Sequence, residues 1–415
     1  MKTKLLILIL SVFLTNLPAQ NSNYTILISF DGFRWDYMDR GITPNLNKIE
    51  KNGVRASSLI PVYPSKTFPN HYSIITGMYP ENHGIIGNTM YDPVYDETYK
   101  ISDNNAVTNP RWYKAEAFWE TAKNFGIKTA SYFWPGSELT LDYRRPDYFE
   151  KYDHHRPYLT RIDGVISWLS MPYNERPKFI TLYFDATDSY GHRFGPTGLE
   201  IDSAITYLDD ITGVLLEKIK LAGLSDSVNL IFVSDHGMTA VDRSKVINID
   251  SVLSGFDYQV YITGSVMLIK PGINSEDKII EHLRKNQRHF KTYRKSEVPD
   301  FYRFSKNTQI PEIVLVSALG WELTNDENYE GFLRWNSKGN HGYEKDMLDM
   351  HGFFLAMGPD FRKSYKTGSL RNIDIYPLLC EIFGIPVRSG VDGDLERIQF
   401  ILSKYENRYF KTTAE

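Results

Sequence analysis

Short apolar runs that end at an acidic residue recur along this chain, and they limit its fold more than any other feature. The clearest runs are Tyr24–Phe30 before Asp31, Phe179–Phe184 before Asp185, and Val228–Ser234 before Asp235-His236. Runs of this length and composition are typical of strands that are buried on both faces of a parallel sheet. Further strands are predicted at Lys128–Trp134, Val266–Lys270 and His351–Met357.

Helical patterns alternate with these strands. They cover Pro44–Asn52, Ala115–Phe125, Leu159–Leu169, Leu199–Ala222, Glu276–Lys285, Ile373–Phe383 and Leu395–Lys404. The alternation predicts an α/β fold: a doubly wound, mostly parallel central sheet with helices on both faces. Residues from about 250 to 339 break the rhythm and are predicted to form a small inserted α+β cap within a catalytic domain that spans 21–415. Ligands of such sheets bind at the carboxyl ends of the strands, where the acidic residues fall.

Composition and the N-terminus bound the protein's class and location. Apolar residues make up 42% of the chain and the net charge is -4, which excludes disorder and argues against binding to nucleic-acid duplexes. Met1–Gln20 has two early lysines, an apolar stretch and then Ala19, the pattern of a secretory signal cleaved near Ala19 or Gln20. Because the chain has a single cysteine, Cys380, a secreted protein of a bacterial periplasm without a stable membrane anchor is expected. The oligomeric state is left open.

The stretch Y-P-S-K-T-F-P-N-H-Y places Thr67 at a predicted helix start. Pro69 suits the first turn of a helix, and Gly77 is a plausible stop. A hydroxyl at this position faces free backbone N–H groups that favour an anion. It is a poor nucleophile unless a base or a metal helps it lose its proton.

Metal-ligand types recur at the predicted strand ends. The candidates are three aspartates, Asp31, Asp188 and Asp235, and three histidines, His192, His236 and His351. Each alone has an ordinary explanation, since an aspartate after a strand is often only a turn former. Their convergence favours zinc, which takes imidazole and carboxylate ligands. Six ligands exceed the need of one zinc, and two zinc ions with Thr67 on one of them would use all six.

Eight stretches, in order along the chain, resemble the ectonucleotide pyrophosphatase/phosphodiesterase family of the alkaline phosphatase superfamily. They are S-F-D-G-F-R (29–34), Y-P-S-K-T-F-P-N-H-Y (63–72), H-G-I-I-G-N-T-M-Y-D (83–92), F-W-P-G-S-E (133–138), Y-F-D-A-T-D-S-Y-G-H (183–192), V-S-D-H-G-M (233–238), G-N-H-G-Y (339–343) and D-M-H-G-F-F-L-A-M-G-P (349–359). The sequence departs from the family pattern at Thr187, where proline is usual, and at Asp185, where glutamate is usual. Neither is a ligand position.

The resemblance implies an alkaline-phosphatase-like fold with two zinc ions per chain. Asp188, His192 and His351 would hold one ion, and Asp31, Asp235, His236 and the Thr67 hydroxyl would hold the other. The Asn88 amide is implied to contact a phosphate oxygen together with the backbone N–H of Thr67 or Phe68. His341 would lie behind the ligands and fix the orientation of one of them, while His71 and His83 would be structural.

The implied activity is zinc-dependent hydrolysis of a phosphodiester or phosphoanhydride bond through a phospho-threonine intermediate. A nucleoside triphosphate or dinucleotide would yield a nucleoside monophosphate, with Phe68, Tyr183 and Tyr152 as aromatic contacts of the substrate. The alternatives are a choline-headgroup lipid phosphodiesterase, a phosphomonoesterase of the same superfamily, or a non-catalytic secreted metal-binding protein. A sulfatase is disfavoured because K-T-F-P-N lacks the C/S-x-P-x-R setting of its nucleophile.

Overall fold

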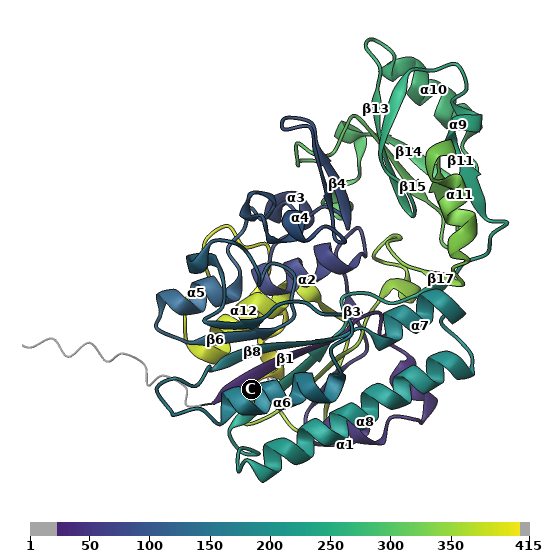
Figure 1. Cartoon of the computed structure of the whole chain (residues 1–415). Helices are drawn as coiled ribbons and strands as arrows, with labels where there is room; N and C mark the ends of the chain where they lie inside the picture. The colour runs from purple at the N-terminus through teal and green to yellow at the C-terminus, as the bar shows by residue number, and fades with distance from the viewer. Residues whose placement is uncertain (1–22, 407–415) are drawn as a thin grey trace, which may run out of the picture.

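A large twisted sheet forms the centre of the protein in a computed structural model that describes residues 23–406 (Figure 1). Its eight strands lie in the order β19 (Tyr365–Thr367), β2 (Val54–Ala56), β18 (Phe354–Met357), β9 (Val228–Val233), β1 (Tyr24–Phe30), β8 (Phe179–Phe184), β6 (Thr129–Tyr132) and β7 (Tyr148–Glu150). The pairs of β1 with β8 and β9, of β8 with β6, and of β6 with β7 are parallel. The exception is β18, which is antiparallel to both of its neighbours. The sheet is therefore mostly parallel, as the sequence predicts.

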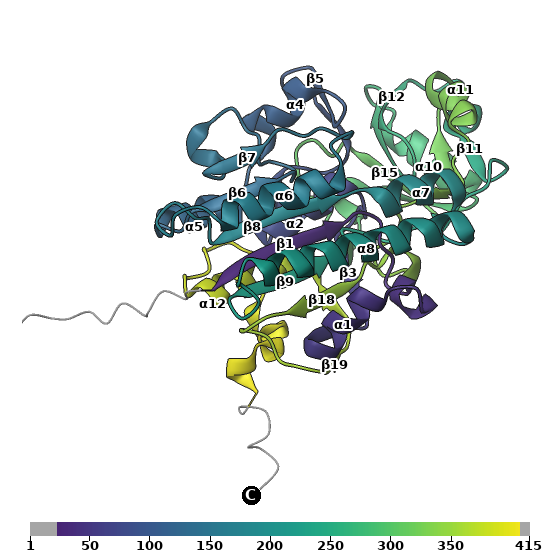
Figure 2. The ribbon, with the colours of Figure 1, turned by 60° about the horizontal axis from the view of Figure 1, so that its bottom comes forward.

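Helices cover both faces of this sheet (Figure 2). On one face lie α1 (Pro44–Asn52), α6 (Tyr158–Leu169) and α8 (Leu199–Leu221); on the other lie α2 (Thr67–Thr76), α5 (Phe118–Asn124) and α12 (Ile375–Phe383). Side chains of β1 alternate between the two cores: Ile26 and Ile28 pack with the first set of helices and Leu27 with the second. The doubly wound architecture predicted from the alternating pattern is therefore confirmed.

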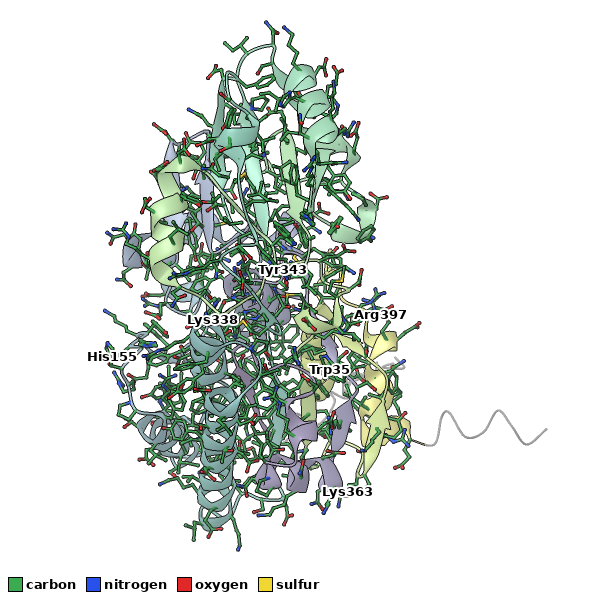
Figure 3. All side chains as sticks on the ribbon, turned by 90° about the vertical axis from the view of Figure 1, so that its right-hand side faces the viewer. Trp35, His155, Lys338, Tyr343, Lys363 and Arg397 are labelled. Carbon is green, nitrogen blue, oxygen red and sulfur yellow. The ribbon has the colours of Figure 1, made fainter. Side chains whose placement is uncertain are left out.

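A separate small sheet lies beside the first (Figure 1, upper right). It has four antiparallel strands in the order β12 (Tyr258–Ile262), β13 (Val266–Pro271), β15 (Ile313–Ser317) and β14 (Phe290–Arg294). It packs with α9 (Ile249–Val252), α10 (Glu276–Asn286), α11 (Asp326–Trp335) and the pair β11 (Val246–Asn248) and β16 (Glu322–Thr324). We call this region the cap. Figure 3 shows Tyr343 where the cap meets the rest of the chain.

The chain enters and leaves the cap through a short antiparallel pair of strands. β10 (Thr239–Ala240) leads into it and β17 (Gly339–Asn340) leads out. The remaining short elements are β3 (Leu59–Ile60), α3 (Pro80–His83), β4 (Thr89–Asp92), β5 (Glu97–Lys100), α4 (Asn104–Thr108), α7 (Ala186–Phe194) and β20 (Leu370–Arg371). The β10–β17 pair anchors the cap beside α7, which follows central strand β8.

Two element predictions near the C-terminus are wrong in part. Leu395–Lys404 is not one helix but three 3-10 turns, 395–397, 399–401 and 403–405. The side chain of Asp394 caps the first turn, and Arg397 is held by Asp374 at 2.5 Å. The strand predicted from His351 begins only at Phe354, because Leu348–Met350 forms a 3-10 turn that ends at His351.

The predicted signal segment, residues 1–20, lies outside the described residues. Among the helices that the structure describes, none has the length and apolar character needed to cross a membrane. The described part of the chain consists of the central sheet, its two layers of helices and the cap.

Candidate active site

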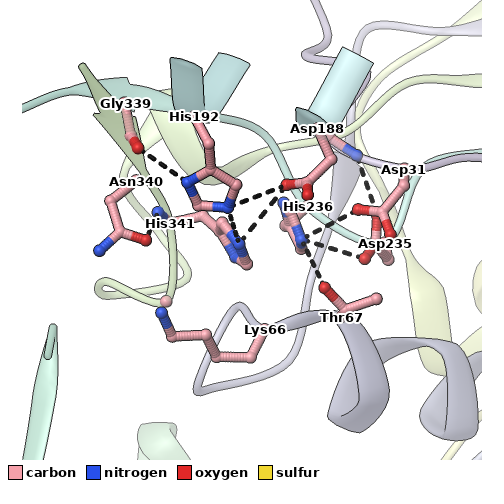
Figure 4. Close-up of polar contacts among 12 residues, drawn as sticks. Asp31, Lys66, Thr67, Asp188, His192, Asp235, His236, Gly339, Asn340 and His341 are labelled. Carbon is pink, nitrogen blue, oxygen red and sulfur yellow. Dashed lines mark hydrogen bonds and ion pairs between the residues drawn. The ribbon is translucent and has the colours of Figure 1, made fainter. Parts of the chain in front are cut away.

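Three carboxylates meet at the carboxyl edge of the central sheet (Figure 4). Asp31 directly follows β1, and Asp235 follows β9 after one serine. Asp188 lies in the first turn of α7, which begins two residues after β8 ends. β1 pairs with both β8 and β9, so these strand ends are neighbours and bring the three side chains together.

Three histidines face these carboxylates. Each turns Nδ1 toward a backbone carbonyl: His192 toward Gly339 at 2.9 Å, His236 toward Gly237 at 2.8 Å, and His341 toward Ser65 at 2.8 Å. Donation from Nδ1 leaves the lone pair on Nε2, the nitrogen that points to the carboxylates.

The resulting distances are those of a ligand cluster. His236 Nε2 lies 3.3 Å from Asp31 Oδ1 and 3.1 Å from Asp235 Oδ2. Asp188 Oδ1 lies 3.3 Å from His192 Nε2 and 3.6 Å from His341 Nε2. The structure thus brings together Asp31, Asp188, Asp235, His192, His236 and His341.

The electrostatics of the cluster suit bound cations. Asp31 Oδ1, Asp188 Oδ1 and Asp235 Oδ2 are buried and have no hydrogen-bond donor among the described residues. Burial and the charges of Asp235 and Asp188 hold the pKa of Asp31 well above its usual value. Although burial opposes it, the charges of His236 and His71 lower the pKa of Asp235 to about 2. Converging unpaired oxygens beside imidazole lone pairs are a donor set that fits zinc.

The histidine that lies beside Asp188 and His192 is not the predicted one. His341 occupies that place: its Nε2 is 3.2 Å from His192 Nε2, and the three residues form a group that can hold one ion. His351 instead turns Nδ1 to Ser58 Oγ at 2.8 Å and belongs to none of the candidate ligand groups found in residues 23–406. The cause is the 3-10 turn before β18, which carries His351 to the β3 side of the strand end.

Close backbone packing puts His341 in its position. A Cβ on Gly339 would stand 2.4 Å from the carbonyl oxygen of Gly191, so only glycine lets β17 approach α7 this closely. The same approach lets His192 bond the Gly339 carbonyl. The two glycines of G-N-H-G-Y, which stand before and after Asn-His, were the sequence signal that could have pointed to His341 as a candidate ligand.

Thr67 is the first residue of α2, and Pro69 lies in the first turn, as the sequence predicts. Gly77 ends the helix in the left-handed conformation, with φ 67°, as predicted. Thr67 Oγ1 lies 3.4 Å from His236 Nε2 and is partly exposed. The hydroxyl therefore stands at a helix N-terminus, beside the Asp31–Asp235–His236 side of the cluster (Figure 4).

Asn88 lies just before β4, and its side chain is tied to the start of α2. Its Oδ1 accepts a hydrogen bond from the backbone N–H of Phe68 at 3.0 Å. The bond fixes the orientation of the amide and uses the Phe68 N–H. A phosphate oxygen at the helix start would therefore be contacted by the Asn88 NH₂ group and the Thr67 N–H, not by the Phe68 N–H.

The three predicted aromatic contacts have different surroundings. The Tyr183 hydroxyl donates to Asp31 Oδ2 at 2.6 Å, and its ring packs edge-on to His71. Phe68 is partly buried against Tyr99, with ring centroids 6.2 Å apart. Tyr152 is 51% exposed, and its ring centroid is 6.4 Å from that of Tyr183. Tyr183 thus supports a candidate ligand, while Tyr152 has the exposed face.

Two further groups hold the cluster from behind. His71 lies between Ser29 Oγ at 2.8 Å and the Thr67 carbonyl at 2.9 Å, with Asp235 Oδ2 3.4 Å away. With both ring nitrogens engaged, His71 braces Asp235 and the helix start. Thr187, where the family pattern has proline, donates its hydroxyl to the Asp31 carbonyl at 2.5 Å. Sequence reasoning gave Thr187 no such role.

The second family departure, Asp185, and the second histidine predicted to be structural, His83, have partners outside the cluster. Asp185 accepts a hydrogen bond from Tyr158 at 3.1 Å and lies 3.3 Å from His154 Nδ1. His83 is buried between Ser73 Oγ at 2.9 Å and the Pro69 carbonyl at 3.2 Å. Neither belongs to a candidate ligand group of the described chain.

Comparison with known proteins agrees with this site. The family model for type I phosphodiesterase/nucleotide pyrophosphatase matches residues 25–344. The chain belongs to this phosphodiesterase family. Membership places it among hydrolases of phosphodiester and phosphoanhydride bonds and confirms the resemblance stated above.

Individual relatives of this phosphodiesterase cover it almost end to end. The bis(5'-adenosyl)-triphosphatase enpp4 of Xenopus laevis is 35% identical over 379 residues, which are 91% of this chain and 81% of that protein. Ectonucleotide pyrophosphatase/phosphodiesterase family member 1 of Rattus norvegicus is 34% identical over 380 residues, 89% of this chain but 42% of that protein. The chain thus spans less than half the length of the rat relative.

The same family supplies a close structural neighbour. Murine ectonucleotide pyrophosphatase/phosphodiesterase 5, solved as an inactive threonine-to-alanine variant in complex with AMP, superposes with a TM-score of 0.86 at 30% identity. The match covers 92% of this chain and all of that one. The central sheet, helix layers and cap are therefore shared with a solved member of the family.

Proposed function

We propose that this chain is a zinc-dependent nucleotide pyrophosphatase/phosphodiesterase. It would release a nucleoside monophosphate from a nucleoside triphosphate or a dinucleotide, through a covalent intermediate on Thr67. The observation that carries the proposal is the placement of the Thr67 hydroxyl, 3.4 Å from His236 Nε2, beside buried carboxylate oxygens that have no donor among the described residues.

Two sets of residues would hold two zinc ions. Asp31, Asp235, His236 and Thr67 form the first set, which we call the nucleophile half. Asp188, His192 and His341 form the second, the leaving-group half, in which His341 replaces the predicted His351. When bound, the ions would supply Lewis-acid activation of the Thr67 hydroxyl and charge stabilisation at the leaving oxygen.

The first step forms one bond and breaks another. Thr67 Oγ1 attacks phosphorus and its proton passes to water. The bond from phosphorus to the leaving oxygen breaks, and its electron pair stays on that oxygen. The Asn88 NH₂ group and the N-terminus of α2 stabilise the negative oxygens that remain on phosphorus. The product of this step is a phospho-threonine that still carries the nucleoside, together with the departing group.

The second step restores the enzyme. Water attacks the phosphorus from the side that the leaving group has vacated, and the bond between phosphorus and Thr67 Oγ1 breaks. Thr67 takes back a proton and the nucleoside monophosphate departs. His71, hydrogen-bonded to the Thr67 carbonyl, keeps the helix start in place through both steps.

Nucleotide substrates are supported by relatives and by exposed aromatic surface. The Xenopus relative is named for a diadenosine triphosphate, and the murine neighbour was solved with AMP. The half-exposed Tyr152 offers a ring face near the Asp31 end of the site, on which any base can stack. We further propose that the enzyme acts after export and removal of Met1–Gln20, which N-terminal sequencing of the secreted protein would test.

Thr67→Ala tests the assignment. With the fold intact by circular dichroism, release of AMP from ATP and from diadenosine triphosphate should fall at least about a thousandfold. Mass spectrometry of wild-type protein quenched during turnover should show an added nucleotidyl group on the peptide that contains Thr67. A Thr67→Ala protein with wild-type turnover would refute the proposal. Dialysis against a chelator should abolish wild-type activity, and zinc should restore it.

A further inference from the structure

Lys66 is next to the proposed nucleophile, but its side chain runs away from the Thr67 hydroxyl. Figure 4 shows it extending from the start of α2 toward the part of the site that carries Asn340 and His341. Its stem is packed against Gly342, where a Cβ would stand 2.2 Å from Lys66 Cε and 2.9 Å from Cδ. Ser265 of the cap would stand 2.4 Å from the same point. The side chain is therefore confined to one direction.

The ammonium at the end of this stem has no partner in residues 23–406: it forms no hydrogen bond and no ion pair there. Burial lowers the pKa of Lys66, and the charges of Glu322 and Asp188 offset part of this effect. Glu322 is itself engaged, since its Oε1 accepts from Tyr343 at 2.7 Å and from Asn340 at 2.5 Å. A partly exposed, unpaired cation thus stands in the site.

The position of the Lys66 side chain relative to the bond that breaks follows from the geometry of in-line displacement. The leaving oxygen lies opposite the attacking oxygen across phosphorus. Thr67 Oγ1 is on the nucleophile half, beside His236, so the leaving oxygen falls on the leaving-group half. The Lys66 side chain is packed on the residue that follows His341, and therefore belongs to that same half.

The charge of Lys66 also shifts the pKa values of histidines in the leaving-group half. Burial, with the charges of His236, Lys66 and His192, holds the pKa of His341 well below its usual value. Burial lowers the pKa of His192, but Asp188 raises it to a value above the ordinary one. The charge of Lys66 opposes this rise. A lysine ammonium is a compact charge with three donors, which suits phosphate oxygens.

We propose that Lys66 binds the phosphate of an anionic leaving group and makes the enzyme selective for phosphoanhydrides over diesters whose leaving group carries no phosphate. The inference rests on the proposed function and deepens it. When the phosphoanhydride bond breaks, its electron pair stays on the bridging oxygen of the departing pyrophosphate or nucleotide. Lys66 contacts the oxygens of that departing group, and the bonds made and broken at phosphorus stay as described above.

Two substrates with one nucleoside test this selectivity. ATP releases pyrophosphate, whereas the p-nitrophenyl ester of AMP releases p-nitrophenol, which has no phosphate. Lys66→Met should lower kcat/KM for ATP by about 10- to 100-fold more than for the aryl ester, the size expected for a hydrogen bond to a charged group. Equal losses for the two substrates would overturn the proposal. A wild-type protein that hydrolyses neither would overturn the proposed function with it.

Rescue separates charge from packing. Lys66→Cys followed by alkylation with 2-bromoethylamine rebuilds an ammonium on a stem of nearly the same length. The chain's other cysteine, Cys380, is buried, and burial raises the pKa of its thiol to about 12, so the reagent attacks position 66 selectively. Alkylation should restore the preference for ATP, and iodoacetamide, which adds no charge, should not. Restoration by both reagents would assign Lys66 a packing role only.

Lys363→Met is the matched control. Lys363 is exposed and lies at the end of the molecule away from the cap (Figure 3). The variant has the same loss of one positive charge, so its ratio of ATP to aryl-ester kcat/KM should equal that of the wild type. A change of ratio equal to that of Lys66→Met would reduce the effect to net charge and would also overturn the proposal.

Discussion

The two halves of the site are held by different parts of the fold. In the nucleophile half, Asp31, Asp235 and His236 come from the ends of adjacent core strands, and none is more than 1% exposed. In the leaving-group half, the Asp188 and His192 side chains are 20% and 17% exposed on α7, and His341 comes from the segment that returns from the cap. The ends of the sheet strands fix these three residues of the first half, to which α2 adds Thr67, whereas the second half depends on contacts between α7, β17 and the cap.

The nucleophile half should be the more sensitive to loss of one charge. Asp235→Asn keeps the size of the side chain and the acceptor for the Gly32 N–H, but removes the charge beside His236. We expect kcat/KM for ATP to fall about a thousandfold or more, because charge is lost where the nucleophile is activated. Steady-state kinetics and zinc content per chain would measure the effect.

Asp185→Asn is the control for that variant. Asp185 also follows a core strand, but it faces Tyr158 and His154. A fall of less than about tenfold is expected, since this carboxylate belongs to neither half. Similar losses in the two variants would mean that a charge at any strand end matters, and would remove the distinction made here.

The leaving-group half can be tested by replacing, one at a time, the two histidines His341 and His351, whose predicted roles the structure reverses. His341→Ala should lower kcat/KM by about 100- to 1,000-fold and reduce bound zinc toward one ion per chain, because it removes a proposed ligand. His351→Ala should retain both ions and most activity per folded molecule. Metal analysis by mass spectrometry and activity assays decide between them, and the reverse outcome would restore the assignment of His351.

These histidines also show what the sequence predicted and what it left open. The ends of the apolar runs located Asp31, Asp235 and His236, because a buried parallel strand dictates where its next residue must lie. Pro69 predicted the start of α2 at Thr67, and Gly77 predicted its end. The sequence prediction made His351 a ligand and placed His341 behind the ligands, although both stand next to glycine and lie ten positions apart. The approach of β17 to α7 decides the matter, and it is a tertiary contact.

Tertiary contacts also explain where the Tyr183 hydroxyl lies and why residues 395–404 do not form one helix. The Tyr183 side chain could have faced a substrate or a ligand, and only the pairing of β1 with β8 puts its hydroxyl on Asp31. The 395–404 segment has apolar residues at helical spacing, yet its ion pair to Asp374 and its burial of Ile398 and Ile401 favour separate turns. In both cases a partner that is distant in sequence determines the local structure, which the local sequence pattern does not.

The stability of the metal-free protein should depend on pH through one titrating group in each half of the site. The two groups titrate in separate pH ranges. The pKa of Asp31 is raised above its ordinary 3.8 by burial and by neighbouring carboxylates, and the pKa of His192 is raised above 6.5 by Asp188 against the effect of burial. A raised pKa in the folded state contributes stability below the unfolded value, and that stability is lost as pH rises through the folded value. These two groups therefore lower the melting temperature of the chelator-treated protein as pH rises, whereas His71 and His341, whose pKa values are lowered by burial, raise it as pH approaches 6.5.

Variants assign this pH dependence to one half or the other. Asp31→Asn should flatten the more acidic part of the curve, and His192→Gln the part above pH 6.5. The zinc-loaded protein should show the opposite slope, because metal binding competes with protons for the same groups. Differential scanning calorimetry of the wild type and both variants, each with and without zinc, measures these effects. A variant of the metal-free protein whose curve matches that of the wild type would contradict the pKa shift assigned to the replaced residue.

The smallest effect should come from Tyr183→Phe, which perturbs the nucleophile half without removing a ligand. The change deletes the hydroxyl that donates to Asp31 Oδ2 at 2.6 Å but keeps the ring packed on His71. Hydrogen bonds behind a ligand are worth about tenfold or somewhat more in metal affinity or activity. We expect kcat/KM to fall about tenfold for ATP and for the aryl ester alike, because both use the same nucleophile. If Tyr183 instead stacks on the substrate base, Tyr183→Phe would keep full activity, and the loss would appear only in Tyr183→Ala as a raised KM for nucleotides.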